Sequence, residues 1–219
     1  MVDYDKETRN LLDRVDRLQE CCKSLQRSLV NYTTHSENSK KGFEKLVSKK
    51  SSVTSYSPSG LLGLLFMKYA DEYKGTDLSE PFCVLGTTFT SLCTEEITLS
   101  DDIKKHLLGS CTTFLEVTWP PLQKEIKSLE NLRVAYDSAV KKVVKNTHAD
   151  KSSKLDSVAK ECKEKYEAQV LRTTTLLKHA CETESTLKSG LKRLAHAQMD
   201  YHKSCLKYLA DSIAKISAE

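Results

Sequence analysis

The chain has 219 residues, of which 39% are apolar and 29% charged, and its formal net charge is +4. These proportions are ordinary for a soluble folded chain of one or two domains. Seven glycines and four prolines are too few for the many turns of an all-β or α/β fold. The longest apolar run, 61–67, is far shorter than the ~18 residues of a membrane-spanning helix. The acidic start is no secretory signal, so we expect a cytoplasmic protein.

The first predicted helix, about 5–50, carries an apolar residue at alternating spacings of three and four. Such a sustained, narrow stripe is typical of a long helix in a coiled-coil seam. Gly42 is the one weak point of this helix, and the same frame resumes beyond it at Phe43 and Leu46. The stripe consists of Leu11, Val15, Leu18, Cys22, Leu25, Leu29 and Tyr32.

The middle of the chain is expected to contain a short helix and a second long one. Serines, a proline and a glycine predict a break at 51–60, followed by a short apolar helix at 61–74. A turn with Ser79 as N-cap leads into a helix at 81–145. Pro120-Pro121 predicts a kink in that helix, because proline removes a backbone hydrogen bond and clashes with the preceding turn.

The last predicted helix, about 153–216, would span nearly 100 Å at ~1.5 Å per residue. Gly190 and the small residues around it allow a bend there. A rod of this length must have its apolar seam covered by neighbouring helices or by another copy. We therefore expect an all-α, bent bundle of three long antiparallel helices that fills the whole chain as a single domain, 1–219.

No catalytic or metal-binding pattern stands out. The eight cysteines include no Cys-x-x-Cys pair, and several fall on apolar stripes, where cysteine behaves as a small buried hydrophobe. The six histidines do not form the Glu-x-x-His pairs of di-iron bundles. A glycine-rich phosphate loop and a nucleophile elbow are also missing. We expect no enzyme, no metal and no cofactor.

Positive charge is concentrated in two parts of the chain. Five lysines lie at 40–50 beside a single acid, and eight lysines lie at 141–165 beside four acids. By contrast, 77–102 holds six acids and no lysine or arginine. Most charge runs are solvated faces, but two basic clusters on a rigid helical body favour a polyanionic partner. Nucleic acid is not expected, since the basic runs lack interleaved aromatic residues and a recognition motif.

Four segments lie in order at 85–92, 121–123, 136–145 and 197–203. Together they resemble the BAR domains of endophilins, amphiphysins and nadrin-type Rho GTPase-activating proteins. The last of them is Ala-Gln-Met-Asp-Tyr-His-Lys at 197–203, near the end of the third helix. The segment 85–92 resembles the start of the family's second helix, and 121–123 resembles its kink motif. Tyr136-Asp137, followed by three lysines, resembles the run that leads to the arm tip.

The resemblance implies a crescent-shaped homodimer with a central six-helix bundle. It also implies a role in binding anionic phospholipid and in sensing or generating membrane curvature, in endocytic or membrane–cytoskeleton trafficking. Each basic residue near an anionic bilayer would contribute on the order of 1 kcal/mol. The residues that the resemblance places at the concave face or the arm tips are Lys45, Lys49, Lys50, Lys124, Lys127, Arg133, Lys141, Lys142, Lys145, Lys151 and Lys154.

Two alternatives stay open at this point. The apolar run at Leu64, Leu65 and Phe66 is either a wedge that enters the lipid interface or a helix that covers the dimer core. The chain as a whole is either a membrane-binding module or a coiled-coil scaffold. Such a scaffold would bind a small GTPase or a cytoskeletal protein without binding lipid.

Overall fold

The computed structural model describes residues 3–38, 57–145 and 149–218, and within these ranges every regular element is helical. Contacts divide the chain into two compact units. Unit 1 consists of Met1–Leu25 with Ser110–Lys188, and unit 2 of Gln26–Gly109 with Ser189–Glu219. The elements in chain order are α1 (Lys6–Asn38), α3 (Pro58–Glu72), α4 (Ser79–Ile103), a π-helical turn η1 (Lys104–Leu108), α5 (Gly109–Thr113), a second π-helical turn η2 (Phe114–Thr118), α6 (Trp119–Lys145), α7 (Ala149–Cys181) and α8 (Thr183–Ile216).

The apolar stripe of α1 forms much of the core of unit 1. Leu11, Val15, Leu18 and Cys22 are each at most 9% exposed, as a coiled-coil seam requires. Further along α1, the seam is less complete than the sequence predicts, because Tyr32 is 53% exposed. The predicted end of this helix, near residue 50, lies outside the described residues.

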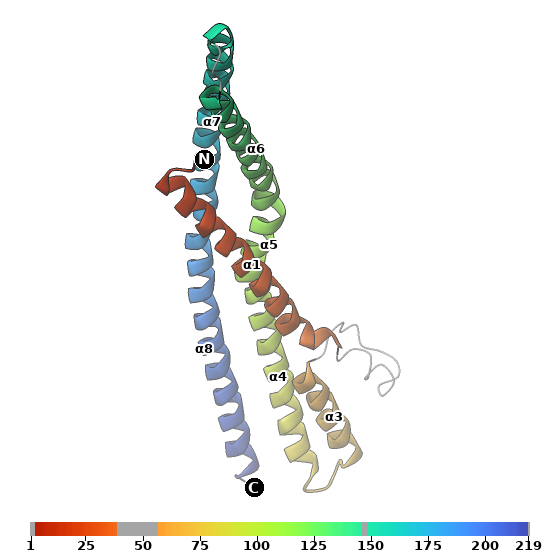
Figure 1. Ribbon diagram of the computed structural model, residues 1–219. Coiled ribbons are helices and arrows are strands. Elements are labelled where there is room, and N and C mark those ends of the chain that lie inside the picture. The colour runs from red at the N-terminus through yellow and green to blue at the C-terminus, as the bar shows by residue number, and fades with distance from the viewer. Residues whose placement is uncertain (1–2, 39–56, 146–148, 219) are drawn as a thin grey trace. The chain divides into compact units, whose positions relative to one another are not determined.

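The long helices α6 and α7 lie side by side in unit 1 (Figure 1). Leu129 of α6 and Leu177 of α7 are fully buried. The rings of Tyr136 and Tyr166 stack between the two helices at a centroid distance of 5.8 Å. Apolar and aromatic packing thus holds the pair together along its length.

In unit 2, α3 and α4 form a tightly packed hairpin (Figure 1). Ser57 caps α3 by accepting a hydrogen bond from the backbone N–H of Gly60, and Pro58 occupies the first helical position. The helix therefore begins within the predicted 51–60 break, three residues before the sequence estimate of 61; residues 51–56 lie outside the described part. Ser79 does not cap α4 as predicted. Its hydroxyl instead donates to the carbonyl of Ala70 at 3.0 Å and ties the hairpin together.

The backbone adjusts before the two prolines rather than at them. Pro120 and Pro121 occupy the first turn of α6, and the preceding five residues form the π turn η2. The N–H of Trp119 donates to the carbonyl of Phe114, five residues earlier, instead of four. A proline ring clashes with the carbonyl four residues before it, so widening this turn makes room for both rings.

The third predicted helix is divided at Glu182 into α7 and α8. The N–H of Glu182 donates to the carbonyl of His179, three residues earlier, which marks a tightened turn. Gly190, where the sequence allows a bend, lies inside α8. A Cβ atom there would sit 3.1 Å from the carbonyl oxygen of His106, so this glycine permits close helix packing within unit 2.

Candidate functional site

Four exposed lysines of α6 form a row on one side of the helix. Lys142 follows Lys124 by 18 residues, and Lys145 follows Lys127 by the same interval. Eighteen residues complete five α-helical turns, so both members of each pair point in the same direction, about 27 Å apart. We call these four residues the lysine row. It lies opposite the buried side of α6, which Leu122 and Leu129 define by their burial.

The remaining basic residues suggested by the sequence are placed differently. Lys141, on the flank of the row, pairs with Asp137 at 2.6 Å, while its side chain stays 57% exposed. Lys154 is exposed on α7. The side chain of Lys151 is outside the described part of α7. The three lysines near the predicted end of the first helix also lie outside the described residues: Lys45, Lys49 and Lys50.

Arg133 does not share the face of the lysine row. Nine residues separate it from Lys124, which is half a rotation out of phase on an α-helix. Its guanidinium group lies over the ring of Tyr4, 5.5 Å from the centroid, and binds both carboxylate oxygens of Glu130 at 2.7 and 2.9 Å. Only 19% of its side chain is exposed. Arg133 thus joins the segment that precedes α1 to α6, on a different face of α6 from the lysine row.

Glu130 is the centre of this contact. The Tyr4 hydroxyl donates to Glu130 Oε2 at 2.6 Å. The hydrogen bonds from Arg133 and then Tyr4 lower the pKa of Glu130 to about 2. Burial, followed by the hydrogen bond to Glu130, raises the pKa of Tyr4 above its ordinary range. Both groups therefore keep their usual charges at neutral pH. Sequence analysis missed this contact because Tyr4 and Glu130 are 126 positions apart.

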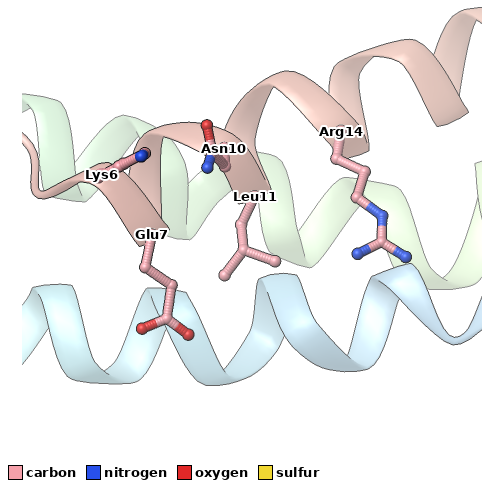
Figure 2. A pocket seen from close by; sticks show the side chains of 5 residues that line it. All are labelled: Lys6, Glu7, Asn10, Leu11 and Arg14. Carbon is pink, nitrogen blue, oxygen red and sulfur yellow. The ribbon is translucent and has the colours of Figure 1, made fainter.

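A second feature of unit 1 is a shallow cavity of about 430 Å³ beside the first turns of α1. Figure 2 shows Glu7, Leu11 and Arg14 extending toward the neighbouring blue helix. Glu7 pairs with Lys178 at 2.6 Å, and Arg14 binds Glu184 through two hydrogen bonds of 2.6 and 2.7 Å. The cavity therefore combines the apolar side chain of Leu11 with two charged groups, Glu7 and Arg14, that already have partners. It offers no nucleophile–base pair for catalysis.

The side chains of the apolar run in α3 do not all face the same way. Phe66 packs into the hairpin, with its ring 6.1 Å from Phe82 and 5.5 Å from Phe89 of α4. Leu65 is 36% exposed, whereas Leu64 is half-buried. The three residues therefore do not form one outward-facing wedge.

An apolar stripe of α8 in unit 2 is exposed to solvent. Met199, Leu206 and Ile213 follow one another at intervals of seven residues and are 45%, 71% and 66% exposed. Leu209, 39% exposed, adds the intermediate position of a heptad. Exposed apolar residues at this period are typical of a coiled-coil seam whose partner is another chain.

The described residues contain no group of three or more histidine, cysteine, aspartate or glutamate side chains arranged to hold a metal ion. In the same ranges no helix is both long and apolar enough to cross a bilayer. The main surface features of the described residues are the lysine row of α6 and the exposed heptad stripe of α8. The longest helices, α1, α7 and α8, are each about 50 Å long at ~1.5 Å per residue. Such features characterise elongated helical scaffolds that act through their surfaces.

Comparison with known families agrees with this class. The model of the BAR domain matches residues 2–217, so the chain belongs to the BAR domain family. As a class, BAR domains are non-catalytic helical modules that generally dimerise, bind membranes peripherally and sense their curvature. The sequence resemblance to this family, and the all-α coiled-coil fold expected from it, are thereby confirmed.

Among curated proteins, the chain is similar to Endophilin-A2 of Bos taurus and of Homo sapiens. Each is 23% identical over 158 residues, which are 72% of this chain and 41% of the relative. The match thus spans less than half the length of these relatives.

Two solved structures share the fold at low sequence identity. The Hof1p F-BAR domain has a TM-score of 0.52 and 13% identity, covering 100% of this chain and 90% of that one. The N-terminal I-BAR domain (1–259) of D. discoideum IBARa has a TM-score of 0.50 and 14% identity, covering 95% and 85%.

Proposed function

We propose that this chain forms a homodimer that binds curved, anionic phospholipid membranes through the lysine row of α6. The observation that carries the proposal is the 18-residue repeat of Lys124 and Lys127 in Lys142 and Lys145. Two basic pairs facing one way on a stiff helix can engage a charged surface at once. Lys141 and Lys154 extend the positive charge beyond the row.

The expected binding energy is a sum of small electrostatic contributions. Each lysine near an anionic bilayer contributes about 1 kcal/mol, and salt screens this attraction within roughly 10 Å. A single row would bind weakly. Two rows held in one rigid dimer engage together, which raises the overall affinity without new contacts. The exposed heptad stripe of α8 supports such a dimer.

The proposal includes a location in the cell. The protein would act as a peripheral protein on the cytoplasmic side of endocytic or cytoskeleton-associated membranes, because that side carries anionic lipid. The similarity to Endophilin-A2 over 158 residues supports this assignment.

Co-sedimentation with liposomes tests the proposal. The variant Lys124→Glu/Lys142→Glu reverses one charge in each pair of the row. We expect at least a tenfold loss of binding to liposomes that contain phosphatidylserine, since two lysines contribute about 2 kcal/mol and their reversal adds repulsion. Wild-type binding should also fall steeply between 50 and 300 mM salt.

A matched control reverses two exposed lysines of α8, as Lys203→Glu/Lys207→Glu, and gives the same net charge. Equal losses in both variants would show that only net charge matters and would contradict a role for the row. Absence of liposome binding, together with capture of a small GTPase, would favour the alternative of a protein-interaction scaffold.

A further inference from the structure

Ser138 lies within the face of α6 that the lysine row occupies. The serine follows Lys124 by 14 residues and Lys127 by 11. It precedes Lys142 by four residues and Lys145 by seven. Intervals of 4, 7, 11 and 14 residues each come close to a whole number of helical turns, so all five side chains leave the helix on one side. Ser138 is exposed on that side.

The surroundings of Ser138 on this face carry no acid. Asn131, Val134 and Ala135 are exposed between the two lysine pairs, and none of them is charged. The other serine of α6, Ser128, is half-buried. A negative charge added at Ser138 would therefore be the first one inside the row.

The two lysines at the end of α6 are the members of the row that such a charge would affect most. At ~1.5 Å per residue, Lys142 and Lys145 lie about 6 and 10 Å from Ser138 along the helix axis, whereas Lys124 and Lys127 lie about 16–21 Å away. Salt largely screens exposed charges beyond roughly 8–10 Å. Two negative charges at Ser138 would thus cancel the charge of the pair at the end of the helix.

The last two turns of α6 are loosely packed, which bears on access to Ser138. Ala139 is the one buried side chain between positions 138 and 145. Segments with few buried apolar contacts open locally at a low cost in free energy. An enzyme that acts on an extended segment can therefore reach the serine when these turns open.

We propose that Ser138 is a phosphorylation site and that its phosphate weakens membrane binding by the lysine row, an inference that rests on the proposed function. A protein kinase would transfer the γ-phosphoryl group of ATP to Ser138 Oγ, with loss of the hydroxyl proton and release of ADP. Lys141 and Lys142 follow the serine by three and four residues. They match a kinase whose substrate groove is acidic.

The phosphate would act through its charge. It carries between one and a half and two negative charges at pH 7 and has three acceptor oxygens. An acidic group that precedes a lysine by four residues forms the favourable ion pair of a helix surface, so the phosphate holds the ammonium group of Lys142. The same phosphate repels anionic lipid. Both effects remove attraction between the end of the row and the bilayer.

Phosphorylation is tested on the whole chain with ATP, Mg²⁺ and a serine kinase that selects basic residues after the serine. Tandem mass spectrometry should locate phosphate on Ser138, and Ser138→Ala should lose that phosphopeptide. After the same treatment, Ser138→Ala should bind liposomes as the untreated chain does. Phosphate at other residues alone, or no phosphate at all, would overturn the proposal.

Co-sedimentation with phosphatidylserine liposomes tests the effect on binding. Phosphoserine is incorporated at position 138 during synthesis, so that every molecule carries the phosphate. We expect binding at least tenfold weaker than that of the unmodified chain, and a smaller loss for Ser138→Glu, which adds a single charge. Thr175→Glu is the matched control, because Thr175 is exposed on α7 and the variant has the same net charge. Its loss should be less than half that of Ser138→Glu.

The unmodified chain separates this inference from the proposed function. If it binds and phosphoserine at 138 leaves the affinity unchanged, the phosphate has no such role while the proposed function stands. Equal losses in Ser138→Glu and Thr175→Glu would show an effect of net charge alone and would also overturn the inference. No binding by the unmodified chain would refute the proposed function and the inference together. Circular dichroism should show unchanged helix content, since a loss through unfolding would contradict the charge mechanism.

Discussion

The Tyr4 hydroxyl joins the segment just before α1 to a carboxylate of α6, and removing this one oxygen atom isolates its contribution. We expect Tyr4→Phe to lower the free energy of unfolding by about 1 kcal/mol. A hydrogen bond to a charged group contributes roughly 1.5–3 kcal/mol, and partial exposure reduces that value. Urea unfolding would measure the loss. Tyr73→Phe is the control, because Tyr73 is 43% exposed and its change should cost less than about 0.5 kcal/mol.

Glu130 makes the same contact sensitive to acid. Its pKa is about 2 in the folded chain against an ordinary value of 4.5, so its ionised form stabilises the fold. This stabilisation is complete above about pH 4.5 and is lost as the pH falls toward 2. We therefore expect wild type to unfold at a higher temperature than Glu130→Gln at pH 7, and the difference to shrink below pH 4. A difference that stays constant down to pH 2.5 would contradict this account.

At the scale of elements, the α3–α4 hairpin depends on two glycines that face each other. A Cβ atom on Gly63 would lie 2.9 Å from the backbone nitrogen of Thr90 and 3.1 Å from the carbonyl oxygen of Gly86. These are backbone atoms and cannot turn aside. We expect Gly63→Ala to separate the helices and to cost about 1–3 kcal/mol in urea unfolding.

Gly109→Ala provides the comparison for that prediction. A Cβ there meets one atom, the carbonyl oxygen of Lys104, at an ordinary distance of 3.4 Å. Alanine is the better helix former by about 0.5–1 kcal/mol, so this variant should be as stable as wild type or slightly more stable. A similar loss in both variants would mean that the hairpin contact is not the cause.

Helix content and the buried seam were accessible from sequence, whereas the local helix geometry was not. The stripe from Leu11 to Cys22 repeats at the coiled-coil period, and periodicity is a strong local signal. The prolines predicted a disturbance, but its form depends on how the preceding turn relaxes. The division at Glu182 has no glycine or proline to mark it. The form of the turn before the prolines and the position of the break at Glu182 depend on packing between helices. That packing cannot be read from a single sequence.

At the scale of the whole molecule, the exposed heptad stripe of α8 predicts the oligomeric state. We expect Leu206→Glu/Ile213→Glu to convert a dimer into a helical monomer, because each leucine or isoleucine buried in a seam contributes about 1.5–3 kcal/mol and the dimer contains two copies of each. Light scattering after size-exclusion chromatography would measure the mass, and circular dichroism the helix content. The control Lys203→Glu/Lys207→Glu should remain dimeric. A double variant of the stripe that stays dimeric would place the interface elsewhere.

The candidate site was predictable in part, because helical spacing places some of its residues and tertiary contacts place the others. Lys124 and Lys142 follow from the sequence, because an exposed face of a regular helix is fixed by spacing alone. The family resemblance grouped Arg133 with them, and tertiary contacts hold its side chain against Tyr4 and Glu130. The contact between Tyr4 and Glu130 left no trace in the sequence, because 126 positions separate the two residues.

The two π turns, η1 and η2, each hold one residue more than a regular turn of α-helix would. Deleting a residue from η1 would close it to ordinary geometry and leave the side chains of the helical turn that follows pointing as before. Closing η2 in the same way would bring back the clash of the two proline rings with the preceding turn. Elsewhere in the same helix a deletion would rotate everything downstream by about 100°. Homologous chains that are one residue shorter are therefore expected to carry the gap at η1, and at η2 only where the two prolines are also replaced.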